Sequence, residues 1–130
     1  MHDDAIARFE AGMVPDAGFH HRDHVEIAWH YVRRYPLPEA LARFAAALKR
    51  FALARGKPDL YHETITTAFV LLINERVNRA APEDWPAFSS RHAELLDWKP
   101  SILDRYYTAE TLGSARARTT FLMPDKLARD

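Results

Sequence analysis

The sequence contains no cysteine, and this absence removes several kinds of chemistry. A chain without cysteine has no disulfide framework, no thiolate zinc site and no thiol nucleophile, so any bound metal must be held by nitrogen and oxygen ligands. Glycine is also scarce, with 4 residues among 130, and no glycine-rich phosphate-binding loop is present. Ser89 and Ser90 lie near His92 but lack the glycine frame of a nucleophile elbow, so we do not expect a serine hydrolase.

Net charge and long hydrophobic runs are missing as well. The 18 basic and 18 acidic residues give a formal net charge of zero, which argues against nucleic acid or an anionic membrane as a partner. The longest apolar run, AFVLLI at residues 68–73, is too short to span a bilayer. The chain begins with Asp3 and Asp4 rather than with the basic and apolar regions of a secretory signal. We therefore expect a cytoplasmic protein that acts on a small molecule, and the sequence leaves a homodimer open.

Hydrophobic periodicity predicts an all-α fold, a compact helical bundle-like single domain over residues 1–130. Proline residues fall between the periodic segments, as expected where helices end. The signals weaken after Pro82, where Pro86 interrupts the pattern, so the C-terminal third is predicted to be less regular. The expected helices are residues 3–11, 23–35, 38–56 and 58–80, then a short or broken helix within 82–96, one that begins at Pro100 or Ser101, and 114–118, before an extended segment to Pro124.

Particular residues mark the expected helix ends. Pro38 suits the first turn of the third helix, and Gly56 suits its C-terminal cap. Asp59 is a candidate N-cap for the fourth helix. Because residues 68–73 are apolar on every side, this fourth helix is predicted to be central.

Histidines are concentrated at the start of the second helix, in the stretch FHHRDHVEIAW at residues 19–29. His21 projects in line with the apolar stripe of this helix and His24 lies just beside it, so both should point inward. Residues three apart on a helix have Cβ atoms roughly 5 to 6 Å apart, close enough for two imidazoles to share an ion. His20 lies on the outer flank and His30 on the polar face, so both are weaker candidates.

A second candidate cluster is YHET, at residues 61–64. His62 falls on a face that must be buried if its helix is central, and the positive end of the helix dipole favours the neutral imidazole that can bind a metal. The same dipole favours an anionic Glu63, which is a candidate fourth ligand or catalytic base. Thr66, one turn further on, could orient the ring or a bound water.

His21, His24 and His62 together predict a three-nitrogen metal site with an open coordination position between two helices. Such a site suits a divalent transition metal, namely zinc, copper or iron, and the sequence does not choose among them. The predicted function is therefore a metal-binding protein and small-molecule metalloenzyme, of the hydrolase, lyase or oxidoreductase type.

Two alternatives explain the same residues. The cluster could serve a metal-free acid–base enzyme, or it could belong to a non-catalytic ligand-binding or interaction module in which histidines satisfy a buried polar network. An inward-facing histidine more often hydrogen-bonds a backbone carbonyl than binds a metal, so this second alternative carries weight.

The C-terminal third supplies candidate substrate-binding residues. Arg118 and Ser114 stand one helical turn apart and could grip a carboxylate or phosphate, with Tyr106 nearby. The structural alternative is that Arg118 pairs with an acidic neighbour or caps a helix, and surface pairs of that kind are common.

Three motifs resemble those of a group of small bacterial helical proteins that have no assigned reaction. The motifs are FxHxDHxxxAW at residues 19–29, YHETxT at 61–66 and YYxxxTLxSxxAR at 106–118. The resemblance implies no function, because none is assigned to that group. It marks a set of positions that overlaps the candidate site, namely His21, Asp23, His24, His62, Glu63, Thr66, Ser114 and Arg118.

Overall fold

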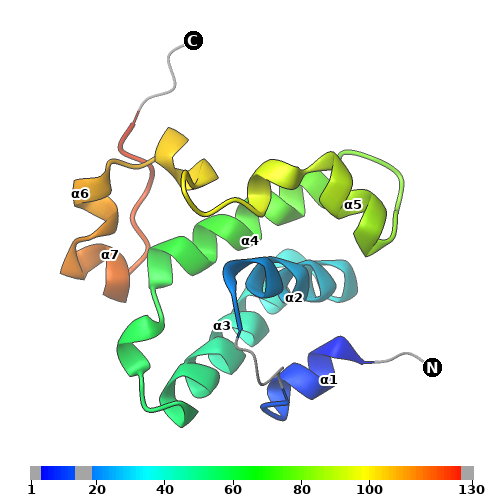
Figure 1. The fold of residues 1–130 in the computed structure, drawn as a ribbon, viewed down its shortest axis with the longest axis horizontal. Helices are drawn as coiled ribbons and strands as arrows, with labels where there is room; N and C mark the ends of the chain where they lie inside the picture. The colour runs from blue at the N-terminus through cyan, green and yellow to red at the C-terminus, as the bar shows by residue number, and fades with distance from the viewer. Residues whose placement is uncertain (1–3, 14–18, 127–130) are drawn as a thin grey trace.

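The computed structural model describes residues 4–13 and 19–126, and these residues form an all-α protein, as predicted (Figure 1). Short 3₁₀ turns lie between the α-helices, at Pro58–Leu60, Ala93–Leu95 and Ile102–Arg105. The helices are α1 (Ala5–Glu10), α2 (His21–Arg34), α3 (Leu37–Ala54), α4 (Glu63–Val77), α5 (Trp85–Arg91), α6 (Ala109–Leu112) and α7 (Ala115–Thr119).

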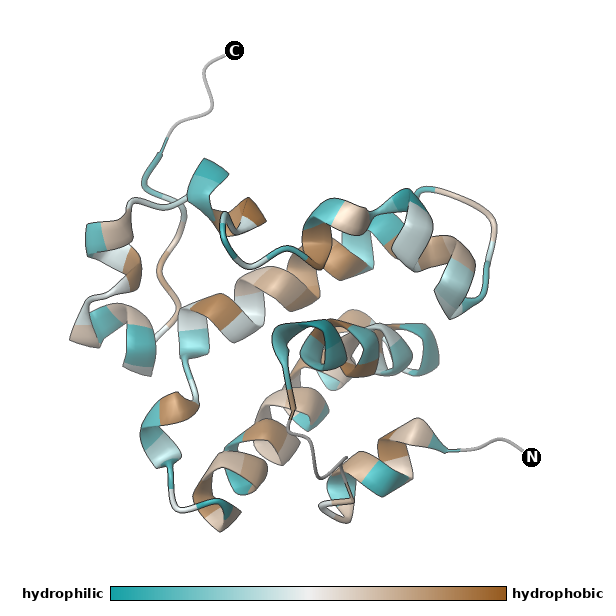
Figure 2. Cartoon of the chain, in the orientation of Figure 1, coloured by the Kyte–Doolittle hydropathy of each residue, from teal (hydrophilic) through white to brown (hydrophobic). Residues whose placement is uncertain are grey.

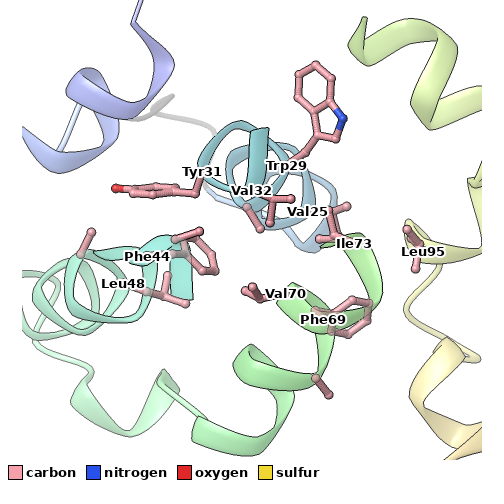
Figure 3. Packing of buried hydrophobic residues seen from close by; sticks show 14 of the residues in the cluster. Val25, Trp29, Tyr31, Val32, Phe44, Leu48, Phe69, Val70, Ile73 and Leu95 are labelled. Atoms are coloured by element: carbon pink, nitrogen blue, oxygen red, sulfur yellow. The ribbon is translucent and has the colours of Figure 1, made fainter. Parts of the chain in front are cut away.

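The centre of the fold is the packing of α2, α3 and α4. Helix α4 contacts α2, α3 and α7, and α1 lies against α2 and α3 (Figure 1). The core between the three central helices includes Val25 of α2, Phe44 of α3 and Ile73 of α4 (Figure 3). Ile73 is completely buried, and the prediction that the apolar fourth helix is central is confirmed.

Hydropathy follows this arrangement along each helix. Figure 2 shows a hydrophobic middle in α4 and a hydrophilic start in α2, where the histidines lie. Ile6 and Phe9 of α1 stand three positions apart, which places them on one face of a helix, and both are buried. Within the described residues, no helix combines the length and the apolar character that a membrane span requires.

The ends of α3 follow the predicted signals. Pro38 lies in its first turn, and Gly56 follows its last residues with a φ of +71°. The amide of Gly56 donates to the carbonyl of Leu53, and that of Lys57 donates to the carbonyl of Ala52, which is a Schellman ending. Glycine suits this position because its left-handed backbone is strained for other residues.

The start of α4 differs from the prediction, because the N-cap is His62 and not Asp59. Asp59 lies in the preceding 3₁₀ turn, and the backbone is extended at Tyr61 and His62 before the helix begins. The His62 imidazole then takes the capping role that was predicted for a carboxylate. Helix α2 likewise begins at His21, two residues before the predicted start.

The C-terminal third is less regular, as expected, but three details differ. Pro86 does not interrupt a helix: it lies in the first turn of α5, where a proline removes no helical hydrogen bond, and Asp84 caps this helix. Helix α6 was not predicted. In place of the helix predicted from Pro100 or Ser101 there is only the 3₁₀ turn Ile102–Arg105, which Ser101 caps, and Ser114 caps α7.

Hydrogen bonds to Thr64 fasten the end of the chain to α4. The Thr64 hydroxyl donates to the carbonyl of Thr120 at 2.8 Å and accepts from the amide of Leu122 at 3.1 Å. Tyr107, also buried, donates to the carbonyl of Leu122 at 2.7 Å. These bonds hold α6 and α7 beside the N-terminal end of α4, close to His62.

Candidate functional site

A cavity of about 360 Å³ lies between α2, α3 and α4. Aromatic and aliphatic side chains form most of its wall, including Phe44 and Phe51 of α3 and Phe69 of α4. A dry cavity of about 150 Å³ already admits benzene, so this volume suits a larger organic molecule. His21, His24 and His62, the three predicted metal ligands, all line it.

His21 uses one ring nitrogen in a hydrogen bond and leaves the other without a partner among the described residues. Its Nε2 lies 2.9 Å from the carbonyl oxygen of Leu95. A carbonyl only accepts hydrogen bonds, so in the neutral ring Nε2 carries the proton and Nδ1 is an acceptor. Burial lowers the pKa of His21, against the opposing effect of the Leu95 bond. The ring also packs against Phe69 and Trp98, with centroid distances of 4.8 Å to each.

Of the three histidines that line the cavity, His24 is the one whose ring makes no hydrogen bond with a residue in the described ranges. It packs on the ring of Phe19 with a centroid distance of 4.3 Å. Burial, followed by the neighbouring His21, lowers its pKa to about 4. The imidazole is therefore uncharged at neutral pH, and it offers one donor and one acceptor nitrogen.

Both ring nitrogens of His62 make hydrogen bonds. Its Nδ1 accepts from the amide of Ile65 at 3.1 Å, which caps α4. This acceptor role places the proton on Nε2, which donates to the carbonyl of Leu112 at 2.7 Å. The side chain is only 7% exposed, so the ring links α4 to α6 from inside the protein.

The geometry brings the three predicted metal ligands to one cavity but does not test whether they bind a metal. The three rings reach one cavity, but His62 has no free nitrogen for a metal while both of its hydrogen bonds are made. Across residues 4–13 and 19–126, no group of three or more His, Asp or Glu side chains is arranged to hold a metal ion. The metal centre, and the choice of zinc, copper or iron, therefore stay predictions.

Glu63 and Thr66, the predicted catalytic pair, are separated. Thr66 is buried and lines the cavity. Glu63 does not line it: its carboxylate accepts from the phenol of Tyr61 at 2.7 Å, and Tyr61 forms the wall there. Burial and this hydrogen bond raise the pKa of Tyr61, so the phenol keeps its proton. Glu63 reaches the cavity only through Tyr61.

The predicted substrate-binding residues lie elsewhere. Ser114 caps α7: its hydroxyl accepts from the amide of Ala117 at 3.1 Å and donates to the carbonyl of Thr111 at 2.7 Å. The exposed Arg118 donates to the carbonyl of Asp59. Tyr106 is half-buried in the core's outer layer and does not line the cavity. These contacts favour the structural alternative for Ser114 and Arg118.

The sequence pattern missed the residues at the mouth of the cavity. Trp98 and Leu60 both line it, yet they are 45% and 66% exposed, so they mark where the cavity meets solvent. An aromatic residue needs no ligand to explain it, so the sequence alone gives no reason to place Trp98 at the mouth of a cavity. A large apolar side chain that is both exposed and beside a cavity is visible only in three dimensions.

A buried arginine was also missed. The Arg76 side chain is 10% exposed and pairs with Glu94, and its NH1 lies 3.1 Å from Nδ1 of His92. This cluster joins α4 to the 3₁₀ turn at Ala93–Leu95 and lies outside the cavity.

Comparisons of this chain with protein-family models, with curated proteins and with solved structures find no match.

Proposed function

We propose that the protein binds a small, largely apolar molecule in the cavity between α2, α3 and α4. The observation that carries the proposal is His24, an uncharged imidazole on a largely apolar wall, with neither nitrogen bonded to a described residue. Small-molecule sites are typically concave and apolar, with a few polar groups that orient the ligand. His24 meets the description of such a group.

The other two histidines of the cavity, His21 and His62, support the proposal because they hold its wall in place. His21 and His62 each use Nε2 to hold a backbone carbonyl of the C-terminal third. These bonds fix the wall of the cavity and keep its shape before a ligand arrives. A preformed site binds with less loss of conformational entropy than one that must first be ordered.

A test uses 2-naphthol as an uncharged probe and isothermal titration calorimetry as the readout. The variant Ile65→Trp adds an indole to the cavity wall, and Leu72→Trp makes the same change on the same helix at a half-buried position outside the wall. Ile65→Trp should weaken binding by about tenfold or more because the indole fills the ligand's space, and Leu72→Trp should leave it unchanged. Equal affinities in the two variants, or no binding to the wild-type protein, would overturn the proposal.

Metal-dependent catalysis is the second candidate. The observation that favours it is the convergence of the three predicted ligands, His21, His24 and His62, on one cavity. It requires His62 to give up its bond to Ile65 or to Leu112, at a cost of roughly 1 to 3 kcal/mol for the group left unpaired.

Elemental analysis of protein purified without a polyhistidine tag tests this candidate. Close to one equivalent of zinc, copper or iron, lost in His62→Ala, would support it. Less than about a tenth of an equivalent, with no stabilisation by added zinc, would reject it, because a ligand that binds only the native state must raise its stability.

A further inference from the structure

The wall of the cavity carries no formal charge at neutral pH. Among the described residues that line it, none is Asp, Glu, Lys or Arg. Its ionisable groups are Tyr61, which gives its proton to Glu63, and three imidazoles. His62 is uncharged because its Nδ1 accepts a hydrogen bond, and His21 and His24 pack against the rings of Phe69 and Phe19, an apolar setting that favours the uncharged form. A charged ligand would therefore lose its hydration and gain no opposite charge in return, which is costly in an apolar site.

The polar atoms that remain available on this wall are mostly acceptors. Nδ1 of His21 is an acceptor because its Nε2 proton is used on Leu95. The phenol of Tyr61 gives its proton to Glu63 and its oxygen receives a hydrogen bond from the Thr66 hydroxyl, so the acceptor left beside the cavity is the oxygen of Thr66. His24 adds one more acceptor together with one donor.

We propose that this cavity selects uncharged ligands that carry a hydrogen-bond donor, such as an aromatic hydroxyl or a heterocyclic N–H, and excludes carboxylates and other anions. This inference rests on the proposed function and specifies the class of its ligand. The donor pairs with the ring of His24, and the ring system of the ligand packs among Phe44, Phe51 and Phe69. Trp98 and Leu60 at the mouth admit it along an apolar path.

The selectivity follows from what each class of ligand leaves unpaired. A hydroxyl gives its proton to an acceptor that is otherwise without a partner in the described structure, so it gains a hydrogen bond. A carboxylate has no proton to give to these acceptors and can pair only with the single N–H of His24, so most of its desolvation cost stays uncompensated. A hydrocarbon gains the apolar contact but offers no hydrogen-bond donor to these acceptors.

The experiment compares three molecules of the same ring skeleton by calorimetry at neutral pH: naphthalene, 2-naphthol and 2-naphthoate. At this pH an aromatic hydroxyl is protonated and a carboxylic acid is ionised. We expect 2-naphthol to bind about three- to tenfold more tightly than naphthalene, from one added hydrogen bond. We expect 2-naphthoate to bind at least about tenfold more weakly than 2-naphthol.

The outcomes separate the inference from the proposed function. Binding of 2-naphthoate as tight as that of 2-naphthol would overturn the exclusion of anions, and equal binding of naphthalene and 2-naphthol would overturn the preference for a donor. In both cases the cavity would still be a ligand site. If none of the three molecules binds, the proposed function itself fails.

A variant at His24 assigns the donor's partner. His24→Leu should reduce the preference for 2-naphthol over naphthalene to about twofold or less, while naphthalene still binds. His30→Leu, the same substitution on the same helix at a half-buried position outside the wall, should keep the preference. An unchanged preference in His24→Leu would overturn the assignment to His24. If His24→Leu does not fold, the wild-type series of three molecules still decides the class of ligand.

Discussion

Replacing His62 with alanine should strongly destabilise the protein, even when no ligand or metal is present. The change removes the cap of α4, which is worth about 0.5 to 2 kcal/mol. It also leaves the carbonyl of Leu112 without its partner in the interior, which costs about 1 to 3 kcal/mol. Together these losses should lower the free energy of unfolding by about 3 kcal/mol, a large share of the 5 to 15 kcal/mol typical of a domain.

Urea denaturation followed by far-ultraviolet circular dichroism measures this loss. His62→Asn is an informative companion because asparagine still caps a helix but is too short to reach Leu112, so we expect a loss between those of alanine and the wild type. Asp84→Ala removes an exposed cap from α5 and should cost only about 1 kcal/mol. A loss below about 0.5 kcal/mol in His62→Ala, or a loss seen only when metal is added, would refute the structural role of both hydrogen bonds.

Three further predictions concern other contacts and are all measured by urea denaturation. His24 has a pKa of about 4 in the folded protein against 6.5 ordinarily, so the unfolded chain binds more protons between these pH values. The free energy of unfolding should therefore fall as the pH drops from 6.5 to 4, by up to about 3 kcal/mol. His24→Gln should flatten this dependence on pH. An equally steep slope in His24→Gln would show that another group is responsible. Thr64→Val should cost about 2 kcal/mol, because both of its buried hydrogen bonds to the end of the chain are lost, and a cost near zero would contradict this. Glu94→Gln should cost about 1 kcal/mol and more than Arg76→Met, because only the first leaves the mostly buried guanidinium without its carboxylate, while the 38% exposure of the Glu94 side chain limits the loss. The reverse order would count against this ion pair.

The sequence predicted those parts of the fold that local physics determines. Apolar spacing predicted the buried faces of α1 and α4, and Gly56 predicted the end of α3 because the signal needs only its own backbone. Helix α6 was missed because four residues are too few to show a hydrophobic period. The proline in α5 was misinterpreted because the same residue can interrupt a helix or begin one.

The sequence likewise predicted one part of the candidate site and not another. Helical faces predicted that His21, His24 and His62 point inward, and all three line the cavity. The partners of their ring nitrogens were beyond prediction, since the carbonyls of Leu95 and Leu112 lie 74 and 50 positions away in the chain. Those distant carbonyls determine which imidazoles already use a ring nitrogen in a hydrogen bond. The proposals of a ligand pocket and of a three-histidine metal centre differ in the ring nitrogens that they require to be available.

Nitrogen-15 NMR of the imidazole rings during titration with 2-naphthol most directly tests whether the cavity holds a ligand against His24. We predict that the ring-nitrogen shifts of His24 change in a saturable manner, while those of His62, whose two hydrogen bonds persist, stay within the spread of the uninvolved histidines. Saturation of the protein with no change at His24, or with its largest change at His62, would contradict the assignment of His24 as the ligand's polar contact.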